Sequence, residues 1–140
     1  MKKIASLIVF TTIVISCSKS VSEQDLQHLN GYWEISEVKT PDNDTKVYQS
    51  NNNADYFVLN DQNGTRSKVV VQLDGTIQSN GIHENFTVKD SVGALYLKYQ
   101  TEFSQWTEKV EQLTEDELII INDNNIKYIY KRFTPITINE

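Results

Sequence analysis

From residue 32 onward, apolar and polar residues alternate with a period of two, as they do on a β-strand that has one buried face. In residues 94–99, for example, the leucines alternate with tyrosine and lysine. Turn residues such as Asp74-Gly75 and Asn124-Asn125 separate the alternating segments. Nine segments have this pattern, over residues 32–39, 54–60, 67–74, 76–78, 83–89, 94–99, 103–113, 117–123 and 126–133, and the shortest is only three residues long, so about eight short strands are indicated.

Strands at this regular spacing predict an all-β domain built as an antiparallel meander, either closed into a barrel or folded as a sandwich. Ser79-Asn80-Gly81 is expected to separate two of the strands. A short helix is expected over residues 21–29, where Ser22 is a candidate N-cap three residues before Asp25. Pro135 follows the last strand and ends it.

The first sixteen residues follow a different pattern, an apolar run after a basic start. Residues 4–15 have the length of a signal-peptide core, whereas a membrane-spanning helix needs roughly 20 apolar residues. Ser16 and Cys17, the only cysteine, end the run. This arrangement resembles the lipobox of bacterial lipoproteins. The resemblance implies that the Cys17 thiol is lipidated and that the chain is cut before it; a secretory peptide cut near Ser16 is the alternative.

A lipidated Cys17 implies attachment to a membrane, because two or more acyl chains anchor a protein stably. Ser18, where an aspartate is absent, resembles the signal of lipoproteins sent to the outer membrane. We therefore expect a location in the cell envelope of a diderm bacterium. The expected organisation is a signal peptide over residues 1–16, a lipidated N-terminus and tether over 17–28, a barrel over 29–133 and a tail over 134–140.

The charge of the mature chain excludes nucleic acid as a partner. The full chain has 13 basic and 19 acidic side chains, and removal of Lys2 and Lys3 leaves 11 against 19, a formal net charge of −8. Such a chain has no basic surface for a phosphate backbone. With Cys17 as the lipid acceptor, no disulfide is expected, so the domain must depend on packing and sheet hydrogen bonds.

Gly31-Tyr32-Trp33 opens the first expected strand. Lipocalins and bacterial lipocalin-like lipoproteins open theirs with a Gly-x-Trp motif, and this chain resembles them over residues 29–133. The resemblance implies that Gly31 lets the chain enter the barrel floor, that Trp33 plugs the closed end, and that Arg132 packs across Trp33. It also implies a lipocalin-like barrel. The long helix before the last strand of larger lipocalins is missing, because residues 113–117 leave room only for a turn.

An eight-stranded barrel has an interior that side chains fill, or that holds one small ligand. In the first case the protein is a scaffold for a protein partner that the sequence does not identify. In the second it binds a small apolar molecule, which is the function we expect. The aromatic side chains that are candidates for lining such a cavity are Trp33, Tyr56, Phe86, Trp106, Tyr128 and Tyr130.

No catalytic, metal or cofactor site is expected. His28 and His83 lack metal-binding partners at a useful spacing. A Gly-x-Ser-x-Gly nucleophile motif is absent, and the three acids of residues 115–117 point in different directions on a turn. We therefore expect a protein that is not an enzyme. Asp90-Ser91-Val92 resembles an O-glycosylation site of some outer-membrane bacteria, with Ser91 as the acceptor.

Overall fold

The computed structural model describes residues 20–135 of the chain. The expected signal peptide and Cys17 lie outside this range, as do the last residues of the tail. No helix in the described range is long and apolar enough to cross a membrane. In chain order the elements are the 3-10 helix η1 (Glu23–Leu29) and the strands β1 (Gly31–Lys39), β2 (Thr45–Val47), β3 (Asn53–Asn60), β4 (Asn63–Val71), β5 (Ile77–Ser91), β6 (Ala94–Gln100), β7 (Gln105–Leu113), β8 (Glu117–Asn122) and β9 (Lys127–Phe133).

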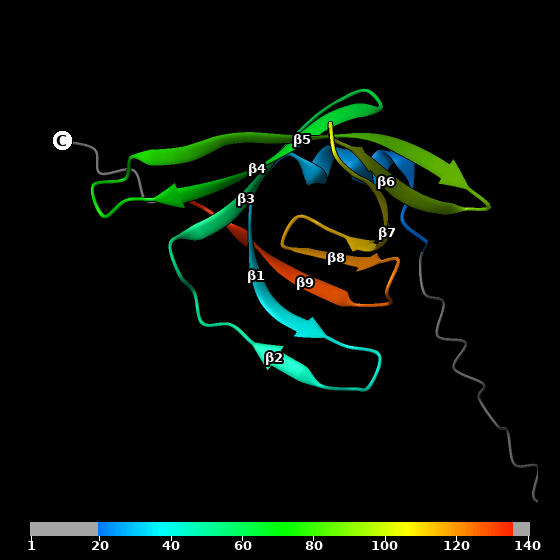
Figure 1. The fold of residues 1–140 in the computed structure, drawn as a ribbon, viewed down its shortest axis with the longest axis horizontal. Helices are drawn as coiled ribbons and strands as arrows, with labels where there is room; N and C mark the ends of the chain where they lie inside the picture. The colour runs from blue at the N-terminus through cyan, green and yellow to red at the C-terminus, as the bar shows by residue number, and fades with distance from the viewer. Residues whose placement is uncertain (1–19, 136–140) are drawn as a thin grey trace, which may run out of the picture.

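The described strands form one antiparallel barrel, which Figure 1 shows as a ring. Each strand from β3 to β9 pairs with the next, and β1 pairs with both β3 and β9, so the sheet closes on itself. The predicted all-β antiparallel meander is thus confirmed as an eight-stranded barrel. The ninth strand, β2, was not among the expected strands. It pairs only with the end of β1, and all three of its residues are exposed, so it has no apolar alternation.

The two ends of the barrel differ. Strands alternate in direction, so the β3–β4, β5–β6 and β7–β8 turns lie at the end where β1 begins. The helix η1 closes this end: it contacts β3 and β7, and buries Leu26 and Leu29 against the barrel core. The β4–β5, β6–β7 and β8–β9 turns lie at the opposite end, which we call the open end.

The predicted helix is present as a 3-10 helix that begins at Glu23. The backbone N–H and the hydroxyl of Ser22 both donate hydrogen bonds, each 2.8 Å long, to the Asp25 carboxylate, which is a capping-box arrangement. Because Leu26 belongs to the barrel core, the packed domain begins inside the stretch assigned to the tether.

Beyond Trp33, strands β1 and β3 diverge. Trp33 and Asp55 form the last residue pair between the two strands, whereas from Glu37 onward β1 pairs with β2. On its other edge β1 stays paired with β9, across a bulge between Ile35 and Glu37. The chain between β2 and β3 therefore crosses the place where the two strands separate.

The expected break at Ser79-Asn80-Gly81 is not there. β5 is one strand of fifteen residues that bends across the barrel from the open end to the closed end. Its register against β4 jumps between Ser67 and Val69, and Gly81 has a φ of +76°. The turn-like sequence is thus a bulge within a continuous strand, and glycine tolerates its positive φ.

An apolar core fills the closed half of the barrel. Trp33, Phe57, Leu97, Leu118 and Ile120 are completely buried and belong to one packed cluster with η1. Burial of each such side chain contributes about 1.5–3 kcal/mol to folding. This part of the interior is occupied by the protein's own side chains, so a ligand site must be sought toward the open end.

Candidate functional site

Charged side chains replace apolar ones on the inner face of the barrel above the core. They come from strands that face one another across the interior, and they alternate with residues on the outer surface. Asp55 precedes Phe57 on the inner face of β3, for instance. Above the core, the inward-facing charged residues of the described range are Asp55, Arg66, Lys68, Glu84 and Glu108.

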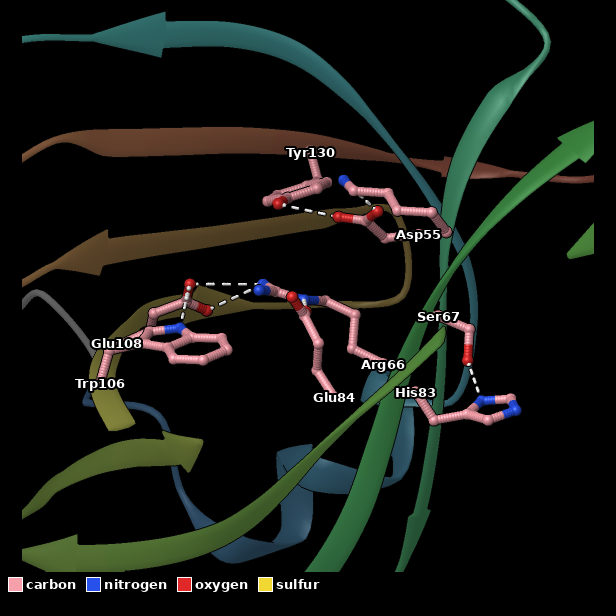
Figure 2. A network of polar contacts seen from close by, with 9 residues as sticks. Asp55, Arg66, Ser67, His83, Glu84, Trp106, Glu108 and Tyr130 are labelled. Carbon is pink, nitrogen blue, oxygen red and sulfur yellow. Dashed lines mark hydrogen bonds and ion pairs between the residues drawn. The ribbon is translucent and has the colours of Figure 1, made fainter. Parts of the chain in front are cut away.

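Arg66 forms the centre of this group, as Figure 2 shows. Its Nε donates to Glu84 at 2.7 Å, and its Nη1 donates to both carboxylate oxygens of Glu108 at 3.3 and 3.1 Å. The guanidinium carbon lies 4.5 Å from the Tyr99 ring centroid and 5.9 Å from that of Phe57. Arg66 and Glu108 are both buried. Because its hydrogen-bonding groups already bind two carboxylates, Arg66 is poorly placed to bind an anionic ligand.

Burial controls the protonation of this group. It raises the pKa of the Glu108 carboxyl above the ordinary value, and the Arg66 charge offsets only part of that rise. Burial alone would lower the pKa of Arg66, but Tyr99 and Glu108 more than offset this effect, so the pKa is raised. Burial also raises the pKa of the Tyr99 and Tyr130 phenols. Near neutral pH, Arg66 is therefore a cation and both phenols are protonated.

Asp55 forms a second polar group, nearer to the place where β1 and β3 diverge. Its carboxylate accepts a hydrogen bond from the Tyr130 hydroxyl at 3.1 Å and forms an ion pair with the Lys68 ammonium. The Asp55 side chain is 2% exposed, whereas that of Lys68 is 62% exposed. The carboxylate is thus fixed inside the barrel, and its cation reaches it from the solvent side.

A pocket of about 130 Å³ lies at this point. It is lined by the inward-facing residues Trp33, Ile35, Asp55 and Lys68 and by the connection between β2 and β3, which contributes Tyr48. Trp33 and Asp55 are the last residues that β1 and β3 pair, so the pocket lies where these two strands diverge toward the open end. We call it the mouth pocket.

Larger hollows lie elsewhere on the protein. One of about 1,040 Å³ is lined mainly by outward-facing residues of β3 to β6, and one of about 970 Å³ lies beside the start of η1 and the β7–β8 turn. A third, of about 440 Å³, lies against η1 and the β3–β4 turn. All three are lined largely by solvated polar side chains. We favour the mouth pocket because a fixed, buried charge lines it.

The residues of the Gly-x-Trp motif meet Arg132 at the closed end. The Arg132 guanidinium carbon lies 3.7 Å from the Trp33 ring centroid, and the Trp33 Nε1 donates to the Leu29 carbonyl at 2.9 Å. Gly31 has a φ of +117°, and a Cβ there would lie 2.9 Å from Arg132 Nη1. Glycine therefore suits both the backbone conformation and the close approach of the arginine.

The aromatic candidates for a cavity lie in different places. Trp33 lines the mouth pocket, and the Tyr130 hydroxyl donates a hydrogen bond to the Asp55 carboxylate, which also lines it. Trp106 stacks on Tyr99 with centroids 4.8 Å apart and donates to Glu108 at 3.3 Å. Tyr128 is half-buried, and its hydroxyl accepts a hydrogen bond from Asn122 at 3.4 Å.

Two of the candidates do not line an open interior. Phe86 is buried in the core, where it packs against Phe57 and Tyr99. Tyr56 lies on the outer face and stacks on Tyr32 with centroids 4.4 Å apart. Strand alternation explains this correction, because the inner face of β3 belongs to Asp55 and Phe57.

Ser91 is exposed at the end of β5, immediately before the two-residue turn Val92-Gly93. His83 lies on the outer face, with Nδ1 2.6 Å from the Ser67 hydroxyl. The backbone carbonyl of His28 accepts a hydrogen bond from the Arg132 guanidinium. Within residues 20–135, no group of three or more His, Cys, Asp or Glu side chains is placed to hold a metal ion.

Sequence reasoning missed the charged interior. The available signal was a charged residue at a position that alternation assigns to the buried face. Glu108 shares its face with Trp106 and Val110, and Asp55 shares its face with Phe57. Arg66 gave a weaker signal, since the strand was expected to begin at residue 67.

The family model described as a lipocalin-like domain matches residues 29–120. A lipocalin-like protein from Bacteroides uniformis is similar in structure, with a TM-score of 0.48 and 15% identity over 76% of this chain and 99% of that one. A protein from Bacteroides eggerthii gives a TM-score of 0.47 and 14% identity over 74% and 98% of the two chains. Apocrustacyanin C1 gives 0.45 and 9% over 86% and 75%. No curated protein matches the chain.

Proposed function

The chain belongs to the lipocalin-like domain family, and from this premise we propose that it is a lipid-anchored binding protein of the cell envelope that holds one small ligand in its mouth pocket. A lipocalin-like barrel suggests small-ligand binding in general, and the fold is typically a binding fold that performs no catalysis. The finer statements, which are the site, the anchor and the location, are our proposal.

The observation that carries the proposal is the buried Asp55 carboxylate in the wall of a pocket. The closed half of the barrel is filled, whereas the mouth pocket has apolar walls at Trp33 and Ile35 and a fixed charge beside them. Such a combination is typical of ligand sites, in which apolar surface supplies affinity and a few polar groups fix orientation. A purely apolar ligand, as expected from the sequence, would leave that charge without a role. We therefore propose an amphipathic ligand.

The closed end is the side that would face the membrane. Ser20, where the described chain begins, lies with Val21 beside the turns Gly93-Ala94 and Thr114-Glu115 of that end. Cys17 precedes Ser20 by three residues, and three residues reach about 10 Å at most. A lipid on Cys17 would therefore hold the closed end near the membrane, and the mouth pocket would take its ligand from the aqueous side.

The test is the response of the mouth pocket to small molecules extracted from the host. In isotope-labelled full-length protein in detergent, the extract should shift the backbone amide signals of Ile35 and Tyr48. Ile35→Phe, which narrows the pocket, should abolish the shift of the Tyr48 signal. Val58→Phe, a similar change on the exposed outer face of β3, should preserve it. An equal shift in the Ile35→Phe protein would contradict the proposal.

A scaffold role is the second candidate, and one observation favours it. Leu73 and Phe103, on the β4–β5 and β6–β7 turns of the open end, are almost fully exposed. Exposed apolar patches mark protein-interaction surfaces, and both of these side chains lie at the same end of the barrel. A photo-reactive residue at position 103 should then cross-link one protein in the host envelope, and Leu73→Ser should weaken that product. Absence of any cross-link leaves ligand binding as the sole candidate.

A further inference from the structure

We propose that the mouth pocket binds a small organic cation, a short alkylammonium, whose charge takes the place of the Lys68 ammonium on Asp55. This inference rests on the proposed function, because it names the class of ligand for the same pocket. Lys68 is then an internal substitute for the ligand and occupies the carboxylate while the pocket is empty.

The first reason is the unequal burial of the ion pair. The Asp55 side chain is 2% exposed and the Lys68 side chain is 62% exposed. A buried carboxylate requires a cation beside it, since an uncompensated buried charge is strongly destabilising. An exposed ammonium, by contrast, loses little when it returns to water. The carboxylate is thus the permanent part of the site and the lysine is the exchangeable part.

The second reason is that the carboxylate is held in position without Lys68. The Tyr130 hydroxyl donates to the other carboxylate oxygen at 3.1 Å, and the Asp55 backbone is paired with Trp33 on one side and with Lys68 on the other. Burial and the Asp55 charge keep the Tyr130 phenol protonated, so it remains a donor. Removal of the lysine side chain should therefore leave a preformed anionic site.

The third reason is the charge of the interior. Above the core, the described charged residues are three carboxylates, Asp55, Glu84 and Glu108, and two cations, Arg66 and Lys68, a formal excess of one negative charge. Arg66 is bound by Glu84 and Glu108. An anionic ligand would have only Lys68 to bind, and would remove the counterion of Asp55 by doing so. A cationic ligand, by contrast, can pair with the Asp55 carboxylate and so replace Lys68 as its counterion.

The size of the pocket limits the ligand. A volume of about 130 Å³ exceeds that of one water molecule and falls below the range of drug-sized sites. An apolar cavity of about 150 Å³ holds one benzene molecule, so the organic part should have about six non-hydrogen atoms or fewer. Trp33 and Ile35 line the pocket beside Asp55, where they would contact an alkyl chain. Butylammonium has the appropriate charge and length.

The test is chemical rescue of a protein that lacks the lysine. Lys68→Ala in the full-length protein should lower the thermal unfolding temperature, because Asp55 loses its cation. Butylammonium chloride should restore it, and sodium chloride at equal ionic strength should not. Affinity for butylammonium should rise about fivefold over that of the unsubstituted protein, since the competing ion pair is gone. Lys98→Ala, which removes an exposed outer-face lysine, is the matched control and should change neither quantity.

Three further measurements decide the outcome. Asp55→Asn should abolish binding of butylammonium, and Lys68→Met, which keeps the aliphatic stem, replaces Lys68→Ala if that variant does not fold. Butanol and butyrate serve as neutral and anionic probes of equal length. If either shifts the Ile35 and Tyr48 signals as strongly as butylammonium does, the cation inference is overturned and the proposed function stands. If no probe and no host extract shifts them, both fail.

Discussion

The Arg132 guanidinium carbon lies 3.7 Å from the centroid of the Trp33 ring, which joins the last strand of the barrel to the first at the closed end. The same arginine donates to the carbonyls of His28, Asn30 and Glu115 at 2.5, 2.8 and 2.8 Å. One side chain therefore links η1, β1, the β7–β8 turn and β9. Each of these segments depends on Arg132 for part of its position.

Replacement of Arg132 by methionine should lower the free energy of unfolding by about 2–4 kcal/mol, because a cation–π contact and three hydrogen bonds to carbonyls are lost. Arg132→Lys should fall in between, since an ammonium does not reproduce the planar set of donors. Urea unfolding measures the effect. Lys131→Met, on the exposed face of the same strand, is the control, with an expected change of less than about 0.5 kcal/mol. Equal losses at positions 131 and 132 would contradict the interpretation.

Gly64 should not accept a larger residue. A Cβ at this position would lie 2.3 Å from Phe86 Cζ and 2.7 Å from the Val58 carbonyl oxygen. Gly64→Ala should therefore cost about 1–3 kcal/mol of stability through overpacking. In a Phe86→Leu background, which removes the nearest ring atoms, the same substitution should cost less. A double-mutant cycle in urea tests this coupling, and strictly additive losses would argue against a clash with the ring.

The raised pKa of Glu108 gives a pH dependence of defined sign. The folded state holds the proton of this carboxyl more tightly than the unfolded state, so the contribution of Glu108 favours folding at low pH. That contribution is lost as the pH rises from the ordinary glutamate pKa of about 4.3 through the raised folded-state pKa. Glu108→Gln removes the ionisable group, so the variant does not lose stability at this position as the pH rises. The free energy of unfolding of the variant, relative to that of the unsubstituted protein, should therefore be higher at pH 7 than at pH 4.

Unfolding curves for both proteins at the two pH values provide the measurement. The exposed Glu102→Gln variant corrects for the change in total charge. A greater relative cost of Glu108→Gln at pH 7 would mean that the pairing with Arg66 dominates over burial.

Cys17 should carry the lipid. Metabolic labelling with an alkyne fatty acid should mark the unsubstituted protein, whereas Cys17→Ser should take up no label. Ser18→Ala, at the neighbouring position, should be labelled as before. Labelling that persists in the Cys17→Ser protein would place the acyl group elsewhere and would remove the basis for an anchor at the closed end.

The barrel could be predicted from the sequence because alternation and turn residues are local signals. The β6 leucines face the core, and Asn124-Asn125 lies in the turn between β8 and β9, as its sequence predicts. β2 could not be predicted, because all three of its residues are exposed and apolar residues therefore do not alternate with polar ones along it. At Ser79-Asn80-Gly81 the sequence has the composition of a turn, and only the pairing with β4 reveals a bulge.

The candidate site was harder to predict, because its partners are far apart in the chain. Asp55 and Tyr130 are 75 positions apart, and Arg66 and Glu108 are 42 apart. Alternation indicates that Asp55 faces inward but does not identify the cation that accompanies it. The residue type of Tyr56 suggests a cavity, whereas its position in the alternation places it on the outer face.

The most direct test of a ligand in the mouth pocket is native mass spectrometry of the full-length protein purified from host membranes. We expect the unsubstituted protein and Val58→Phe to retain one small bound species, and Ile35→Phe and Asp55→Asn to lose it while keeping their thermal unfolding cooperative. An unsubstituted protein that carries no small molecule, or an Ile35→Phe protein that carries the same one, would contradict a ligand site in this pocket.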